Sequence, residues 1–118
     1  MAQQQKVAFL GLGVMGYPMA GHLATAGYDV CVYNRTASKS KAWVEQYGGR
    51  SADTPTAAAQ GAELVFVCVG NDDDLRQICV GEHGAFKGMS SGAVLVDHTT
   101  ASAQVARELH VVAASQGI

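Results

Sequence analysis

The stretch Gly11-Leu12-Gly13-Val14-Met15-Gly16 decides how this chain of 118 residues folds. It follows Lys6–Leu10, a compact apolar run that is too short for a helix and therefore predicts a β-strand. It opens residues 14–26, in which apolar residues recur at helical spacing on one face. A Gly-x-Gly-x-x-Gly pattern is weak alone, but its position between a strand and a helix gives it structural meaning.

Each glycine of this turn has a physical task in that context. Gly11 permits the tight turn, Gly13 lets a pyrophosphate approach the backbone, and Gly16 lets the helix pack closely on the strand. The free N–H groups and the positive end of the helix then face the phosphates. The turn therefore predicts a dinucleotide site, and a glycine-rich turn without a ligand is the alternative.

The rest of the chain alternates strand and helix patterns. Strands are expected at residues 28–33, 63–69 and 93–96, helices at 38–47, 72–80 and 102–115, and a short helix from Thr54-Pro55. Residues 64–69 are apolar on both faces, which is typical of a parallel sheet covered on both sides. The sequence predicts an α/β fold, a Rossmann-type doubly wound parallel sheet with helices on both faces. A helix ends just before Ile118, so we interpret residues 1–118 as one such domain, truncated before its fifth strand.

Composition narrows the classes of protein to consider. The chain is 48% hydrophobic and 15% charged with a net charge of −2, which gives no reason to expect nucleic acid as a partner. No apolar run approaches the roughly 20 residues of a membrane span, and no signal peptide is evident. The cysteines and histidines lack metal-ligand spacing, so no metal is expected. Cysteines in apolar segments favour buried thiols in a cytoplasmic protein.

A second signal follows the second predicted strand, where Asn34-Arg35-Thr36 stands with Lys39 one turn further on. Proteins that bind NAD usually place Asp or Glu at this position to accept hydrogen bonds from the ribose 2′-hydroxyl. A carboxylate repels the 2′-phosphate of NADP, whereas an arginine fork binds phosphate. The segment therefore predicts NADP, with NAD less favoured, and ordinary solvated cations are the alternative.

Two further turns fall at the carboxyl ends of strands, where ligands of open α/β sheets lie. In Val69-Gly70-Asn71, Gly70 lets backbone approach a ligand. The following Asp72-Asp73-Asp74 suggests a metal, but acidic residues in the first turn of a helix are the better explanation. In Asp97-His98-Thr99-Thr100, His98 is a candidate proton donor without a visible partner. Thr100 or Ser102 is expected to cap the last helix.

Four segments together resemble the β-hydroxyacid dehydrogenases. They are residues 11–20 (GLGVMGYPMA), 34–36 (NRT), 69–71 (VGN) and 97–100 (DHTT). That family includes 3-hydroxyisobutyrate dehydrogenase, tartronate semialdehyde reductase and glyoxylate or succinic semialdehyde reductases, and 6-phosphogluconate dehydrogenase is a relative. The resemblance covers the chain from about Lys6 onward.

The resemblance implies roles for individual positions. The cradle for the dinucleotide comprises Gly11, Leu12, Gly13, Val14, Met15 and Gly16. Asn34, Arg35 and Thr36 are implied to hold the adenosine ribose and its phosphate, with Lys39 nearby. Val69 and Gly70 are implied to pack on the cofactor, and Thr100 to contact it near the nicotinamide. The family's Ser-Gly-Gly segment, catalytic lysine and all-helical second domain are not found before Ile118, so no catalytic residue is assigned here.

The resemblance implies the cofactor domain of an oxidoreductase that interconverts a small β-hydroxyacid and its semialdehyde or oxo acid, and residues 34–36 with Lys39 favour NADP as its cofactor. The parent enzyme is expected to be a homo-oligomer with a small-molecule substrate, and this chain alone is expected to be inactive. An NADPH-dependent imine reductase shares the Asn-Arg-Thr turn and remains an alternative. A non-catalytic module that binds NADP(H) as a sensor or scaffold is the alternative from another class.

Overall fold

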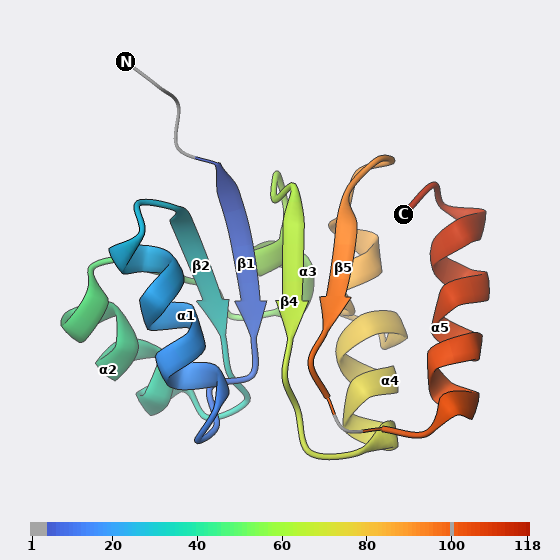
Figure 1. Cartoon of the computed structure of the whole chain (residues 1–118), viewed down its shortest axis with the longest axis horizontal. Coiled ribbons are helices and arrows are strands. Elements are labelled where there is room, and N and C mark those ends of the chain that lie inside the picture. The colour runs from blue at the N-terminus through green and yellow to red at the C-terminus, as the bar shows by residue number, and fades with distance from the viewer. Residues whose placement is uncertain (1–4, 100) are drawn as a thin grey trace.

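A five-stranded parallel sheet forms the centre of the computed structural model, which describes residues 5–99 and 101–118. The strands are β1 (Lys6–Leu10), β2 (Asp29–Tyr33), β3 (Arg50–Ser51), β4 (Leu64–Val67) and β5 (Val94–Asp97), in the spatial order β3-β2-β1-β4-β5. The chain builds outward from β1 to β3, then returns to β4 on the other side of β1 (Figure 1). This reversal creates a switch point between the carboxyl ends of β1 and β4, where ligands of such sheets bind. The predicted Rossmann-type fold is confirmed.

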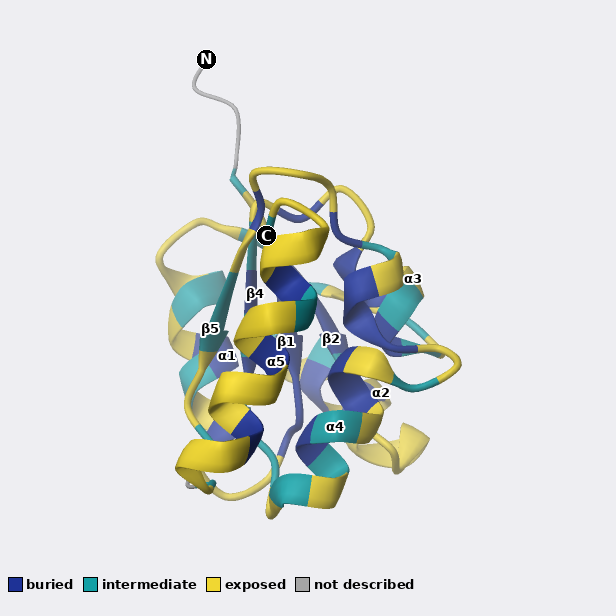
Figure 2. Ribbon diagram, turned by 90° about the vertical axis from the view of Figure 1, so that its right-hand side faces the viewer, coloured by how far each residue is buried: buried dark blue, intermediate teal, exposed yellow. Residues whose placement is uncertain are grey.

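Helices cover the sheet on both faces (Figures 1 and 2). On one face lie α1 (Gly16–Thr25) and α2 (Ala37–Tyr47); on the other lie α3 (Pro55–Ala59), α4 (Asp72–Val80), the 3₁₀-helix η1 (Ala85–Lys87) and α5 (Ala103–Ser115). Side chains alternate between faces along each strand. Phe9 of β1 therefore packs in the cluster that includes Trp43 of α2, whereas Leu10 packs in the cluster that includes Leu75 of α4. Both clusters are buried, which fixes the register of the strands.

The sheet has one strand more than the four expected within the chain. The additional strand, β3, consists of only Arg50 and Ser51, which pair with Cys31 and Val32 of β2. Both residues are exposed, so they lack the apolar pattern that reveals a buried strand. Arg50 Nε also donates a hydrogen bond to Asp29 Oδ1 (3.0 Å), which ties this strand to β2. The expected strand count is corrected to five.

Polar side chains cap three of the helices that follow strands or loops. Thr54 Oγ1 accepts a hydrogen bond from the N–H of Ala57, with Pro55 in the first turn, as the sequence predicts. Ser102 Oγ accepts from the N–H of Val105 and caps α5, which also confirms its predicted role. Asn71 caps α4 ahead of its three aspartates, which lie in the first turn where the helix dipole favours acids.

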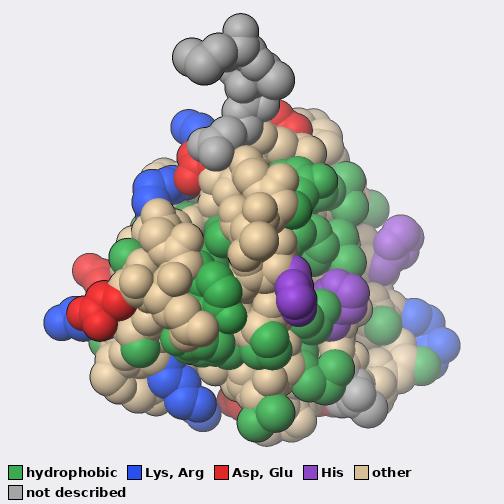
Figure 3. Space-filling model, turned by 60° about the vertical axis from the view of Figure 1, so that its left-hand side comes forward, with side chains coloured by type: hydrophobic (Ala, Val, Ile, Leu, Met, Phe, Trp, Pro, Cys, Tyr) green, Lys and Arg blue, Asp and Glu red, His purple; other side chains and the backbone are tan. Residues whose placement is uncertain are grey.

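The face of β4 and β5 on the α1 and α2 side carries apolar side chains that reach the surface. Val94 is 49% exposed, and Phe66 is partly buried with its ring stacked on the His98 ring at 6.1 Å between centroids. Figure 3 views the molecule from the side of α1 and α2 and shows hydrophobic side chains gathered at the surface beside two histidines. Within the described residues, no helix has the length and apolar character needed to cross a membrane.

Candidate functional site

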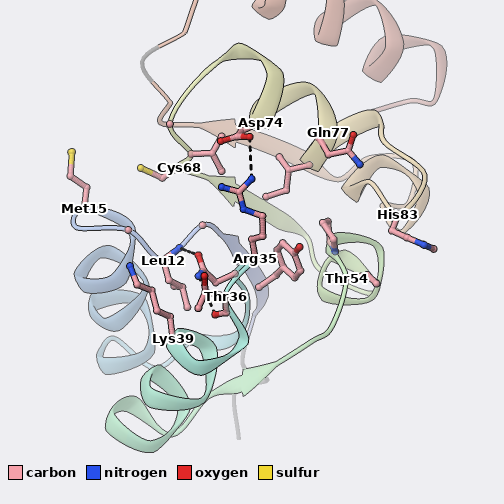
Figure 4. A pocket seen from close by; sticks show the side chains of 18 of the residues that line it. Leu12, Met15, Arg35, Thr36, Lys39, Thr54, Cys68, Asp74, Gln77 and His83 are labelled. Atoms are coloured by element: carbon pink, nitrogen blue, oxygen red, sulfur yellow. Dashed lines mark hydrogen bonds and ion pairs between the residues drawn. The ribbon is translucent and has the colours of Figure 1, made fainter.

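The carboxyl ends of β1, β2 and β4 border a cleft of about 630 Å³ at the switch point of the sheet (Figure 4). One wall comes from the glycine turn and from the segment that follows β2. The other wall comes from the turn after β4, from α4 and from two loops. The lining residues are Gly11, Leu12, Gly13, Val14, Met15, Tyr33, Asn34, Arg35, Thr36, Lys39, Asp53, Thr54, Pro55, Cys68, Val69, Gly70, Asp74, Gln77, Ile78 and His83.

The structure brings nearly all of the predicted cofactor-binding residues together around this cleft. Two predicted residues are not among its lining residues. Gly16 is buried below the turn, at the start of α1, and acts through packing. Thr100 lies outside the described residues. Segments that are far apart in the sequence, such as the turn after β1 and the turn after β4, therefore form one concave surface.

The conformation of the glycine turn explains the positions of its glycines. Gly11 has a φ of 102°, and a methyl group there would overlap the carbonyl oxygen of Cys68. A methyl group on Gly16 would overlap the carbonyl oxygen of Gly11 and press on the Phe9 ring. Gly13 is different, because a methyl group there meets no atom within 4 Å. Gly11 and Gly16 are thus required by the fold, whereas Gly13 leaves open space beside the cleft.

The backbone N–H groups of Gly13, Val14 and Met15 provide the anion-binding potential of the site. All three residues are exposed and line the cleft. Among the described residues, no group accepts a hydrogen bond from these three N–H groups. They precede α1, whose amino-terminal end carries a partial positive charge. Unpaired donors at such a helix end fit the pyrophosphate of a dinucleotide.

Hydrogen bonds from the end of β2 hold the glycine turn in place. The N–H of Gly11 donates to the Tyr33 carbonyl (2.9 Å), and the N–H of Leu12 donates to Asn34 Oδ1 (2.9 Å). Asn34 Nδ2 in turn donates to the Thr36 carbonyl (3.2 Å). Asn34 therefore positions the turn through its amide, in addition to lining the cleft.

Opposite charges face each other across the cleft. Arg35 Nη1, from the segment after β2, lies 3.6 Å from Asp74 Oδ1 of α4. Figure 4 marks this ion pair with a dashed line. The Arg35 side chain is 84% exposed and that of Asp74 is 35% exposed. Asp74 Oδ2 also accepts a hydrogen bond from Asn71 Nδ2 (3.3 Å). Lys39 adds a second cation to the wall that holds Arg35.

The three aspartates that begin α4 have separate partners and do not converge. Asp72 accepts hydrogen bonds from Ser102, at 2.9 Å from its N–H and 2.5 Å from its hydroxyl. These bonds lower the pKa of the Asp72 carboxyl. Asp73 pairs with Arg76 (3.1 Å), and Asp74 points into the cleft. Within residues 5–99 and 101–118, no cluster of side chains suited to holding a metal ion is found.

Hydrogen bonds also join the turns that follow β4 and β5. The N–H of Val69 donates to Thr99 Oγ1 (3.1 Å), and the N–H of Thr99 donates to Asp97 Oδ1 (2.8 Å). This arrangement fixes the edge of the cleft at Val69. His98 is not a lining residue, because its ring stacks on Phe66. The structure therefore does not bring His98 into the site as a proton donor.

The cysteines are free thiols, and one of them reaches the cleft. Cys68 lines the cleft and is partly buried, and this burial, helped by the charge of Asp97, raises its pKa. Cys31 and Cys79 are buried in the core. Burial raises the pKa of Cys79 to about 12, so its thiolate is suppressed at neutral pH.

Several lining residues were not predicted. They are Tyr33, Asp53, Thr54, Pro55, Cys68, Asp74, Gln77, Ile78 and His83. Most belong to the wall beyond β4, whose approach to the wall of β2 is a consequence of the sheet order. Asp74 carried a signal as part of the acidic run, but only the rotation of α4 separates its direction from those of Asp72 and Asp73.

A doubly wound parallel sheet with unpaired N–H groups of a glycine turn beside a switch-point cleft defines a dinucleotide-binding Rossmann domain. Comparison with known proteins identifies the family. The chain belongs to the family described as the NAD binding domain of 6-phosphogluconate dehydrogenase, whose model matches residues 6–118.

Two curated relatives illustrate the similarity. The chain is 70% identical over 104 residues to an uncharacterized oxidoreductase of Shewanella frigidimarina (strain NCIMB 400). The aligned region covers 88% of this chain and 36% of the relative. It is 41% identical over 105 residues to the probable 3-hydroxyisobutyrate dehydrogenase-like 1, mitochondrial, of Arabidopsis thaliana, covering 88% of this chain and 31% of the relative. The chain thus spans about a third of the length of the relatives it matches.

Solved structures agree with this family. The 3-hydroxyisobutyrate dehydrogenase of Mycobacterium tuberculosis with L-serine is 26% identical, with a TM-score of 0.86 over 98% of this chain and 38% of that chain. An imine reductase from Myxococcus stipitatus in complex with NADP+ is 28% identical, with a TM-score of 0.84 over 96% of this chain and 38% of that chain. A variant of an imine reductase from the same organism is known with NAD+.

Proposed function

We infer that this chain binds NADP(H) in preference to NAD(H), as the cofactor domain of an oxidoreductase. The main support for this proposal is the segment after β2, where Asn34, Arg35 and Lys39 line the cleft. Proteins that bind NAD usually have an acidic residue at the end of this strand, and this chain has none there. Arg35 presents a planar fork of donors suited to a phosphate. Within this segment, the described residues offer no carboxylate that would accept hydrogen bonds from a ribose 2′-hydroxyl.

The lining residues suit the parts of the dinucleotide in turn. The free N–H groups of Gly13, Val14 and Met15 bind the pyrophosphate. Arg35 and Lys39 bind the 2′-phosphate, and Val69 and Gly70 pack against the cofactor beyond β4. Thr100 is proposed to approach the nicotinamide. The bound cofactor supplies the hydride chemistry, and the protein supplies binding and orientation.

The reaction of the whole protein is proposed to interconvert a small β-hydroxyacid and its semialdehyde or oxo acid. The relatives named as 3-hydroxyisobutyrate dehydrogenases support this substrate class. A homo-oligomeric assembly and catalytic groups outside this chain are parts of the same proposal, so the chain alone is expected to be inactive. The free thiols are in keeping with a reducing compartment such as the cytoplasm.

An imine reductase is the second candidate, because an imine reductase with NADP+ has a closely similar fold. The whole protein, supplied with NADPH, distinguishes the two by its activity on semialdehydes and on cyclic imines. Turnover of semialdehydes alone supports the hydroxyacid assignment, whereas turnover of imines alone supports the second candidate. Binding of NADPH without turnover of either class indicates a non-catalytic module.

The cofactor preference is tested by calorimetric titration of the chain with NADP+ and NAD+. Arg35→Asp is expected to weaken NADP+ binding by about 1.5–3 kcal/mol, because a charge-assisted contact is lost and a repulsive one gained. NAD+ binding should change little. Arg107→Asp is the matched control, since it makes the same charge change at an exposed position of α5. Equal affinity of the unmodified chain for NADP+ and NAD+ contradicts the proposal.

A further inference from the structure

Asp74 is a carboxylate in a cleft whose opposite wall carries the cations Arg35 and Lys39. Its side chain is 35% exposed, and its Oδ2 accepts a hydrogen bond from Asn71 Nδ2 (3.3 Å). Its other oxygen lies 3.6 Å from Arg35 Nη1. In this state the guanidinium that suits a ligand phosphate is already paired with a carboxylate of the protein.

We propose that Asp74 limits the preference of this cleft for a phosphate-bearing dinucleotide by competing with the ligand's 2′-phosphate for Arg35. The inference rests on the proposed binding of NADP(H). A phosphate that binds Arg35 must replace the Asp74 carboxylate or share the guanidinium with it at the cost of repulsion between two anions. A dinucleotide without this phosphate leaves the Arg35–Asp74 pair intact.

The neighbouring aspartates show that this role is specific to Asp74. Asp73 is 91% exposed at its side chain, pairs with Arg76 on its own helix and does not line the cleft. The Asp72 carboxylate accepts its hydrogen bonds from Ser102. All three acids contribute similarly to the charge at the start of α4, so the helix dipole does not distinguish them. Of these three aspartates, Asp74 alone pairs with Arg35, the cation proposed to bind the phosphate.

The expected change in NADP+ affinity depends on two interactions of Asp74, its exposed ion pair with Arg35 and its repulsion of the 2′-phosphate. Such pairs contribute little on their own, and repulsion across several ångströms of water is of similar size. Removal of the Asp74 charge should therefore raise affinity for NADP+ by about three- to tenfold at low ionic strength. Affinity for NAD+ should change by less than about twofold, because the competing phosphate is absent.

The experiment compares Asp74→Asn with Asp73→Asn in calorimetric titrations of the full chain with NADP+ and NAD+. Asparagine at 74 keeps a side-chain oxygen that can accept from Asn71, and thermal unfolding checks that both variants fold. Asp74→Asn should tighten NADP+ binding selectively, whereas Asp73→Asn should leave both affinities near those of the unmodified chain. Equal gains from the two variants, equal gains for both dinucleotides, or no gain from Asp74→Asn overturn the proposal.

The Arg35→Ala background tests whether Asp74 acts through Arg35. There, Asp74→Asn should give a clearly smaller gain in NADP+ affinity than in the unmodified chain, because Arg35 is missing and only the repulsion between Asp74 and the phosphate is relieved. A full gain in that background overturns competition for Arg35. If the unmodified chain itself does not prefer NADP+, the proposed function fails. If it prefers NADP+ and Asp74→Asn changes nothing, only the role of Asp74 fails.

Discussion

Replacement of Gly13 by alanine should weaken dinucleotide binding without weakening the fold. Gly13 is exposed, its φ lies outside the left-handed region, and a methyl group there meets no protein atom within 4 Å. The free energy of unfolding should therefore stay equal or rise by up to about 1 kcal/mol, because alanine restricts the unfolded chain. The same methyl group projects beside the unpaired N–H groups where the pyrophosphate is proposed to lie. Overpacking of that contact should cost about 1–3 kcal/mol of binding, or roughly 5- to 150-fold in affinity.

Gly16→Ala provides the contrast, because its methyl group conflicts with the protein itself. It would overlap the Gly11 carbonyl oxygen and press on the buried Phe9 ring, both of which are held by the sheet. The expected loss of stability is about 1–3 kcal/mol, which should lower the thermal midpoint by at least about 4 °C. Binding should weaken too, since the turn must shift to relieve the overlap.

Thermal unfolding followed by circular dichroism and titration with NADPH followed by its fluorescence separate the two outcomes. Gly13→Ala should lower the affinity for NADPH and leave the thermal midpoint unchanged or slightly higher. Gly16→Ala should lower both the affinity and the thermal midpoint. Normal NADPH affinity of Gly13→Ala would show that the pyrophosphate does not approach this turn. An unchanged midpoint for Gly16→Ala would refute the argument that close packing of α1 requires a glycine there.

Three further predictions concern the cysteines, a helix cap and the core. At pH 8, iodoacetamide should modify Cys68, which lines the cleft, and spare Cys79, whose pKa burial raises to about 12; mass spectrometry should show NADPH slowing the reaction at Cys68. Ser102→Ala removes the cap of α5, so urea denaturation should show a loss of about 1 kcal/mol, whereas an unchanged midpoint would mean that the cap is not needed. Trp43→Ala should cost about 3–5 kcal/mol, but Trp43→Phe should cost much less, because it removes a buried indole N–H that has no partner among the described residues; equal losses would contradict this.

The sequence predicts the fold well where the same residues determine both the local structure and its packing in the sheet. The glycine turn and the apolar runs of β1 and β4 indicate a parallel sheet from the sequence alone, and the structure confirms it. The prediction was less accurate where packing decides. The third predicted strand extended to Val69, but β4 ends at Val67 because the chain then turns toward Thr99. The two exposed residues of β3 gave no periodic signal at all.

The sequence predicts the residues of one wall of the cleft, because local motifs define them. It does not predict most residues of the opposite wall, because they come together only when the chain folds. The glycine turn and the segment after β2 carry their own signals in the sequence. Gln77 and His83 became lining residues only because β4 follows β1 in the sheet and brings α4 and its following loop to the cleft. No spacing along the chain specifies that approach, since it depends on strand order and on the rotation of α4.

The class of ligand and the choice of cofactor depend on different parts of this site. The turn that suits a pyrophosphate is held by backbone hydrogen bonds, by the Asn34 amide and by the close packing of Gly16, all of which also stabilise the fold. Arg35 and Asp74 are exposed or partly exposed, and their contact is an ion pair that contributes little to stability. Substitutions at 35 and 74 are therefore free to alter cofactor preference at nearly constant stability. Substitutions at Gly11 and Gly16 should always change stability and binding together.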